Sequence, residues 1–184
     1  MKPLTSHRHA IEVEERTVKY LSFTLGKDHY AVDVMHIRKI VEYIEPLHVP
    51  LVPSFVKGVL HLLGSVVPII DLSVYFGGNR AEITRQTCII IVEIHDNGRH
   101  LDIGIVVDTV SNVVEFSAKD ILPAPDFSNR LRNHFVQGMS KVGERFILLL
   151  ELNGIFSRDE LQLVQSLKSE TDVKSNSNGA VIPE

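Results

Sequence analysis

The sequence predicts a mostly β protein in which two small barrels lie side by side and one helix closes the C-terminal end. Three observations lead to this fold. The 23 valines and 17 isoleucines among 184 residues are β-branched, and such side chains fit a pleated sheet better than a helix. Two segments carry β-hairpin signals, and one stretch of the chain recurs at a constant offset of 80 positions.

Length and composition indicate one packed unit. A chain of 184 residues has the length of a single domain, and 44% hydrophobic with 23% charged residues is typical of a globular protein. The net charge of −4 offers no overall attraction to a polyanion. We therefore do not expect a nucleic-acid-binding protein.

The N-terminal segment and the cysteine content predict a cytoplasmic protein. Residues 1–17 mix charged and polar types without periodicity, which predicts a mobile arm, and they lack the apolar run of a secretory signal. The longest uncharged stretch, 58–70, is shorter than the roughly 20 apolar residues of a membrane span, so no direct membrane insertion is expected. The single cysteine, Cys88, cannot form an internal disulfide.

Two hairpins are predicted from alternation and turn residues. The first joins apolar positions 21, 23 and 25 to positions 30, 32 and 34 through Gly26-Lys27-Asp28. The second joins 87–94 to 101–107 through a segment that contains Asn97-Gly98, a strong signal for a tight hairpin turn.

The internal repeat predicts two related subdomains. The segment 55–76 overlays without a gap on 135–156, and in each copy a strand, a turn, an apolar strand, an acid and a short helix follow one another. A weaker similarity relates Ile40-Val41-Glu42 to Val113-Val114-Glu115. Because small sheets avoid exposed edges by curling, we expect two barrels, at roughly 18–82 and 83–168, with a binding cleft between them.

The C-terminal end predicts one helix followed by a disordered tail. Ser157 and Glu160 have the spacing of a capping box, and apolar residues follow at helical spacing, which predicts a helix at about 158–169. The remaining residues, 169–184, are polar and of low complexity, and we expect them to be disordered.

No pattern in the sequence indicates catalysis, a cofactor or a metal. The histidine pairs His7 with His9 and His95 with His100 lie in the predicted arm and beside a turn, where polar residues are ordinary. Cys88 lies within a predicted strand, where an inert thiol is the usual outcome. We expect a non-enzymatic protein without cofactor or metal.

Several separated blocks resemble the CheW family of chemotaxis coupling proteins. The longest block, 55–72, contains Gly58, a turn that corresponds to the family's N-L-R-G, and the V-x-P-x-x-D-L strand that ends at Asp71-Leu72. Further blocks at 23–33, 104–110 and 121–125 follow in the family's order, so the resemblance extends from about Tyr20 to Leu167.

The resemblance implies two five-stranded SH3-like barrels and a non-enzymatic adaptor. Family members couple the cytoplasmic tips of methyl-accepting chemoreceptors to the regulatory domain of a CheA-type histidine kinase. Receptor helices dock near the groove between the barrels, and an exposed face of one barrel pairs with the kinase. The partner-binding residues that correspond here are Ile37, Lys39, Gly58, His61 and Leu63.

Three of these positions differ from the family pattern. Leu63 replaces the Arg of N-L-R-G with His61 in place of the Asn, and Lys39 replaces the Glu of a V-x-E-I block. We expect Lys39 and Leu63 to be exposed and to select an unusual partner. Two alternatives stay open: a regulatory adaptor that binds the kinase or another CheW-like domain without conventional receptor docking, and a small-ligand or enzymatic role in the cleft.

Overall fold

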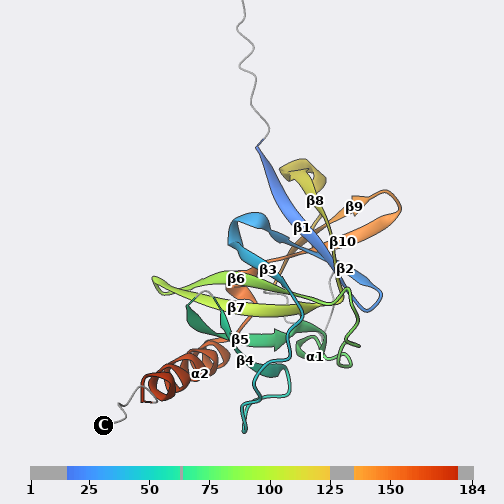
Figure 1. The fold of residues 1–184 in the computed structure, drawn as a ribbon. Coiled ribbons are helices and arrows are strands. Elements are labelled where there is room, and N and C mark those ends of the chain that lie inside the picture. Colours follow the sequence, from blue (N-terminus) through green and yellow to red (C-terminus); the bar gives the residue numbers. More distant parts are fainter. Residues whose placement is uncertain (1–15, 63, 125–134, 178–184) are drawn as a thin grey trace, which may run out of the picture.

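A computed structural model describes residues 16–62, 64–124 and 135–177 of the chain, which form two five-stranded sheets and a C-terminal helix (Figure 1). Sheet A contains β1 (Thr17–Leu25), β2 (Asp28–Asp33), β8 (Thr109–Ser117), β9 (Val136–Val142) and β10 (Arg145–Leu150). Sheet B contains β3 (Ile37–Glu42), β4 (Val56–Leu62), β5 (Ser65–Asp71), β6 (Cys88–Asp96) and β7 (Arg99–Val107). The helices are η1 (Val34–His36), α1 (Leu72–Tyr75), η2 (Ala118–Asp120), η3 (Leu152–Gly154) and α2 (Arg158–Ser177). The predicted mostly β fold with two five-stranded units and a C-terminal helix is confirmed.

The two sheets contain equivalent strands in a different chain order. The order is β8-β1-β2-β10-β9 in sheet A and β3-β6-β7-β5-β4 in sheet B. Both have one parallel pair, β2 with β10 and β5 with β7, at the same place among antiparallel pairs. Sheet A therefore matches sheet B after a circular permutation, in which the hairpin at the start of the chain supplies the last two strands.

This strand exchange corrects the predicted subdomain boundary. Residues 37–107 form sheet B, whereas sheet A combines residues 17–33 with residues from 109 onwards. The division expected near residue 83 is wrong, because local alternation identifies strands but does not determine their distant partners.

The internal repeat corresponds to equivalent strands. β4, β5 and α1 begin at Val56, Ser65 and Leu72, and β9, β10 and η3 begin 80 positions later. The weaker similarity also corresponds to structure, because Val41 of β3 pairs with Ile89 and Val114 of β8 pairs with Tyr20, at matching places in the two sheets.

Both predicted hairpins are present. In the first hairpin Tyr20 of β1 pairs with Asp33 of β2, and the pairing continues to Leu25 with Asp28. In the second, β6 pairs with β7 as far as Asp96 with Arg99. In the second turn Asn97 and Gly98 have φ angles of 47° and 78°, the left-handed conformation that a two-residue hairpin turn requires.

Each sheet encloses a small core, and a larger core joins the two sheets. Alternation divides the strand residues between these cores, because successive side chains point to opposite faces. The core of sheet A consists of Tyr20, Ala31, Phe116, Ile147 and Leu149. The core of sheet B consists of Val67, Ile69, Ile89, Ile91 and Val106. The shared core contains residues of both sheets together with Leu161, Val164 and Leu167 of α2.

The C-terminal helix begins as predicted and continues further. The capping box is formed, since Ser157 Oγ accepts from the Glu160 amide at 3.3 Å and Glu160 Oε2 accepts from the Ser157 amide at 2.8 Å. Helix α2 packs against β5 and extends to Ser177, beyond the expected end at 169. No glycine or proline interrupts the sequence before Gly179, so nothing local ends the helix earlier. None of the helices in the described part of the chain is long and apolar enough to cross a membrane.

Candidate partner-binding surface

Ile37 and Lys39 lie on β3, which forms one edge of sheet B. A bulge sets Ile37 opposite Val92 and Lys39 opposite Ile91, so Arg38 is the extra residue between them. Ile37 is half-buried against the shared core, whereas Lys39 is exposed. Among the described residues no carboxylate lies within ion-pair distance of Lys39. Its charge is therefore open to a partner.

Gly58 is buried in β4 and positions another residue. Its φ is +145°, and a Cβ at this position would lie 2.1 Å from the carbonyl oxygen of Leu47. The absence of a side chain lets Leu47 exchange two backbone hydrogen bonds with Val59, at 2.9 and 3.0 Å. The Leu47 side chain is thereby fixed at the surface with 68% of its area exposed. Gly58 thus acts on this surface through Leu47.

His61 lies exposed on β4, beside an open apolar hollow of about 690 Å³. Leu47, Val59, Leu60 and Val66 supply most of its apolar lining. Glu45 and His61 are the polar residues of this lining, and the apolar remainder suits an apolar side chain of a protein partner.

The two edge strands of sheet B contribute to the same small core. Val41 and Tyr43 extend from β3, Leu60 and Leu62 extend from β4, and all four pack on the core of sheet B. The Lys57 ammonium lies 5.3 Å from the centre of the Tyr43 ring, which joins the end of β3 to the start of β4. The predicted site residues on both strands therefore belong to one subdomain. Leu63 lies outside the described residues.

Tyr43 contacts two charged side chains, Glu45 through its hydroxyl and Lys57 through its ring. Its hydroxyl donates to Glu45 Oε2 at 2.7 Å. Burial, followed by the hydrogen bond to Glu45, raises the pKa of Tyr43 well above its usual value, so the phenol stays neutral. The Lys57 contact is consequently a cation over a neutral ring.

Sequence reasoning missed the apolar residues that accompany Lys39 and His61. Leu47 is the main example, and Ile40, on the same strand as Lys39, is 42% exposed. Ile40 could have been recognised from its place in an alternating strand. Leu47 could not, because its exposure depends on pairing with a residue twelve positions away.

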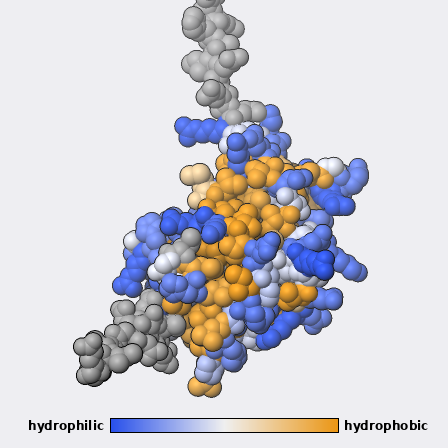
Figure 2. Space-filling model, viewed as in Figure 1, coloured by the Kyte–Doolittle hydropathy of each residue, from blue (hydrophilic) through white to orange (hydrophobic). Residues whose placement is uncertain are grey.

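The surface seen in Figure 2 carries a continuous hydrophobic band, which runs from the upper sheet across the middle of this face to the loop 43–55 at the bottom. Large exposed apolar patches on a soluble protein usually mark an interaction site. The band therefore indicates a protein-binding face.

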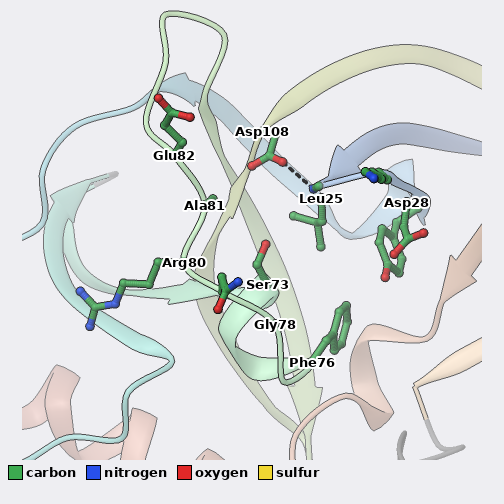
Figure 3. A pocket seen from close by; sticks show the side chains of 13 residues that line it. Leu25, Asp28, Ser73, Phe76, Gly78, Arg80, Ala81, Glu82 and Asp108 are labelled. Atoms are coloured by element: carbon green, nitrogen blue, oxygen red, sulfur yellow. Dashed lines mark hydrogen bonds between the residues drawn. The ribbon is translucent and has the colours of Figure 1, made fainter.

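A second hollow lies between the first hairpin of sheet A and the segment that begins at α1. It has a volume of about 660 Å³ and takes Leu25 and Tyr30 from sheet A and Ser73 and Phe76 from α1 and its end (Figure 3). Asp108 Oδ2 accepts from the Gly26 amide at 2.6 Å, so this carboxylate fastens the turn of the first hairpin. Arg80 points away from Asp108 in this view, and the two charges form no pair.

The other candidate groups take up separate positions. Cys88 is half-buried, and burial raises the pKa of its thiol, which keeps it in the unreactive protonated form. His95 and His100 lie directly opposite each other on β6 and β7, and Glu93 contacts both rings. The strand register thus adds a carboxylate to a histidine pair that looks ordinary in the sequence.

Comparison with known proteins identifies relatives along most of the chain. The family model described as "CheW-like domain" matches residues 19–160. The chain is 34% identical over 149 residues to the chemotaxis protein CheW of Klebsiella aerogenes, covering 81% of this chain and 87% of that protein. It is 31% identical over 140 residues to the chemotaxis protein CheW of Rhizobium meliloti, covering 76% and 88% of the two chains.

A solved structure agrees with these sequence matches. The scaffolding protein CheW from Thermoanaerobacter tengcongensis superposes with a TM-score of 0.68 at 28% identity, covering 77% of this chain and 94% of that one. The family model, the relatives above 30% identity and this common fold give the same result: the chain belongs to the CheW-like domain family.

Proposed function

We propose that this protein is a non-enzymatic adaptor that couples chemoreceptors to a CheA-type histidine kinase in chemotaxis-type signalling. The observation that carries the proposal is the match to chemotaxis CheW proteins through both sheets. The solved relative from Thermoanaerobacter tengcongensis is itself a scaffolding protein. An adaptor for cytoplasmic receptor tips would work in the cytoplasm.

The two edge strands of sheet B are the proposed binding surface. β3 contributes an unpaired cation at Lys39, and β4, with the loop that pairs with it, contributes an imidazole at His61 and an apolar anchor at Leu47. Interfaces of this type gain most of their affinity from a few apolar anchors, whereas rim charges mainly select the partner. We therefore assign affinity to Leu47 and selectivity to Lys39, with Leu63 as a further selecting position.

The experiment measures binding of the full chain to two purified partners, the regulatory domain of the cell's CheA-type kinase and a receptor cytoplasmic tip. Leu47→Asp should weaken binding to the partner that covers this surface by at least about tenfold, roughly 1.4 kcal/mol. Val142→Asp is the matched control, because Val142 is an aliphatic residue 40% exposed on β9 of sheet A, outside the loop that carries Leu47. If wild type binds neither partner, the proposed function fails, and if both variants behave alike, only the assigned surface fails.

An alternative function is favoured by Lys39 and Leu63, which differ from the family pattern. In this alternative the protein binds the kinase, or another CheW-like domain, without conventional receptor docking. Lys39→Glu combined with Leu63→Arg should then improve binding to generic receptor tips and weaken binding to the native partner. Arg145→Glu, a charge reversal at an exposed position of β10 in sheet A, is the control. If the double variant stays within about twofold of wild type for both partners, roughly 0.4 kcal/mol, these positions do not select the partner.

A further inference from the structure

Three potential metal ligands meet at the turn end of the β6–β7 hairpin. Glu93 and His95 are two positions apart on β6, so they lie on one face of the strand. His100 of β7 is the direct cross-strand partner of His95. The register of one hairpin therefore brings a carboxylate and two imidazoles together.

The distances between these groups suit one small cation. Glu93 Oε1 lies 3.1 Å from His95 Nε2 and 3.0 Å from His100 Nδ1. The three potential ligand atoms all lie within 4.8 Å of one another. A tetrahedral zinc ion with ligands at about 2.0 Å holds its donor atoms about 3.3 Å apart, so the two distances from Glu93 already suit a coordination sphere, and the two rings would turn their nitrogens toward a common ion.

Neighbouring contacts hold the three groups in place. The Asn153 side chain of η3 accepts from the His95 amide at 2.9 Å, which fastens this end of the hairpin to the rest of the molecule. Arg38 Nη1 binds Glu93 Oε2 at 3.1 Å and leaves Oε1 directed at the two rings. Such outer contacts normally orient the ligands of a metal site.

Two charged side chains flank the proposed ligands, Arg38 beside Glu93 and Asp102 beside Arg38. Arg38 brings a positive charge close to any bound cation. Asp102, whose Oδ1 lies 3.9 Å from Arg38 Nε, partly offsets that charge.

We propose that Glu93, His95 and His100 form a zinc-binding site with its fourth position open to water. Two imidazoles and one carboxylate are ligands that zinc prefers, whereas magnesium and calcium favour oxygen ligands alone. The proposal goes beyond the adaptor function, and its test measures zinc binding without any protein partner, so its failure would leave the adaptor function unaffected.

The test is calorimetric titration of the untagged full chain with zinc chloride. Wild type should bind one zinc ion at this site, and His95→Gln with His100→Gln should weaken that binding by at least about tenfold. The matched control is His7→Gln with His9→Gln, which also removes two imidazoles and should leave the affinity of the site within about twofold. Glu93→Gln, which keeps the shape of the side chain, should also weaken binding.

A second measurement shows whether the variants remain folded. Each variant should keep the wild-type circular dichroism spectrum, and zinc should raise the melting temperature of wild type but not of the His95/His100 variant. The proposal is overturned if wild type binds no zinc at a free zinc concentration of about 100 μM, which is 100-fold above a micromolar Kd. It is also overturned if the His7/His9 variant, rather than the His95/His100 variant, loses the binding.

Discussion

Sheet A and sheet B share two structural features that differ in how closely they are packed. In both, a loop segment crosses a glycine of an edge strand, Leu47 over Gly58 in sheet B and Leu122 over Gly138 in sheet A. In both, an acid after the inner strand caps a short helix, Asp71 in one and Glu151 in the other. The Gly58 contact is closer than the Gly138 contact, and Asp71 is buried whereas Glu151 is half-buried, although Leu47 is more exposed than Leu122. Sheet B also packs against helix α2 and carries the proposed binding residues. The repeated sequence therefore gives both sheets the same contacts, but the packing around each copy determines how much these contacts contribute to the free energy of unfolding.

The largest expected effect distinguishes the two glycines. Gly58→Ala should lower the free energy of unfolding by about 3 kcal/mol or more, because it combines a positive φ with a Cβ 2.1 Å from a backbone oxygen. Gly138→Ala meets the Leu122 oxygen at 2.7 Å without a positive φ and should cost about 2 kcal/mol. Chemical denaturation of both variants measures the difference.

Gly143→Ala separates the effect of a positive φ from the effect of a close contact with the added Cβ. Gly143 has a φ of +60° and no atom within 4 Å of the added Cβ, so it reports backbone strain alone, about 1 kcal/mol. Equal losses at Gly58 and Gly143 would show that the crossing of Leu47 does not constrain sheet B.

A somewhat smaller effect is expected from the helix that covers sheet B. Leu161 is 5% exposed in the shared core, and Leu161→Ala should lower the free energy of unfolding by about 2 to 3 kcal/mol. Gln162→Ala, at the next and exposed position of α2, should change it by less than about 0.5 kcal/mol. Amide hydrogen exchange should show the loss of protection first in β5, and uniform loss in both sheets would contradict a special role of α2 at sheet B.

The capping acids should differ by a smaller amount. Asp71 Oδ1 accepts from the amides of Ser73 and Val74, at 3.0 and 3.3 Å, and its side chain is buried. Asp71→Ala should therefore cost about 2 kcal/mol. Glu151 accepts one amide hydrogen bond, from Asn153 at 3.3 Å, in an exposed setting, and Glu151→Ala should cost about 0.5 kcal/mol. Thermal unfolding of the pair measures this, and equal costs would show that burial does not strengthen the cap.

The smallest effect concerns acid stability at the end of β8. Hydrogen bonds from the backbone and side chain of Ser117, both at 2.8 Å, lower the pKa of Asp120 below its ordinary 3.8. The stabilisation is therefore fully present above pH 3.8 and is lost as the pH falls through the lower pKa of the folded state. Asp120→Asn should have a lower free energy of unfolding than wild type above pH 3.8, and this difference should shrink only as the pH falls below that value. Denaturation at a series of pH values measures it. Ser117→Ala should reproduce part of the change, and a difference that is constant with pH would contradict this cause.

The sequence was sufficient for the features that depend on nearby residues. Alternation and turn residues located both hairpins, and the spacing of Ser157 and Glu160 located the start of α2. A glycine also stands at the same point of both repeat copies, Gly58 and Gly138, and the close approaches of Leu47 and Leu122 are the structural reason for it.

The features that depend on distant partners could not be read in this way. The pairing of β2 with β10 joins Tyr30 to Leu148, and no local pattern selects that partner. For the same reason Leu47 was missed at the binding surface. Glu93 could have been found, since its spacing from His95 and the turn before His100 already place the three residues on one face.

The permuted strand order affects how the chain folds during synthesis. Strands β3 to β7 are consecutive, so sheet B can close as soon as Val107 has left the ribosome. The β1–β2 hairpin is made first but has to wait for β8 and β10, which pair with its two sides. During this interval both of its edges are open to pairing with other chains. The first hairpin to be translated is thus the last to be enclosed, and a nascent chain halted after sheet B would expose it.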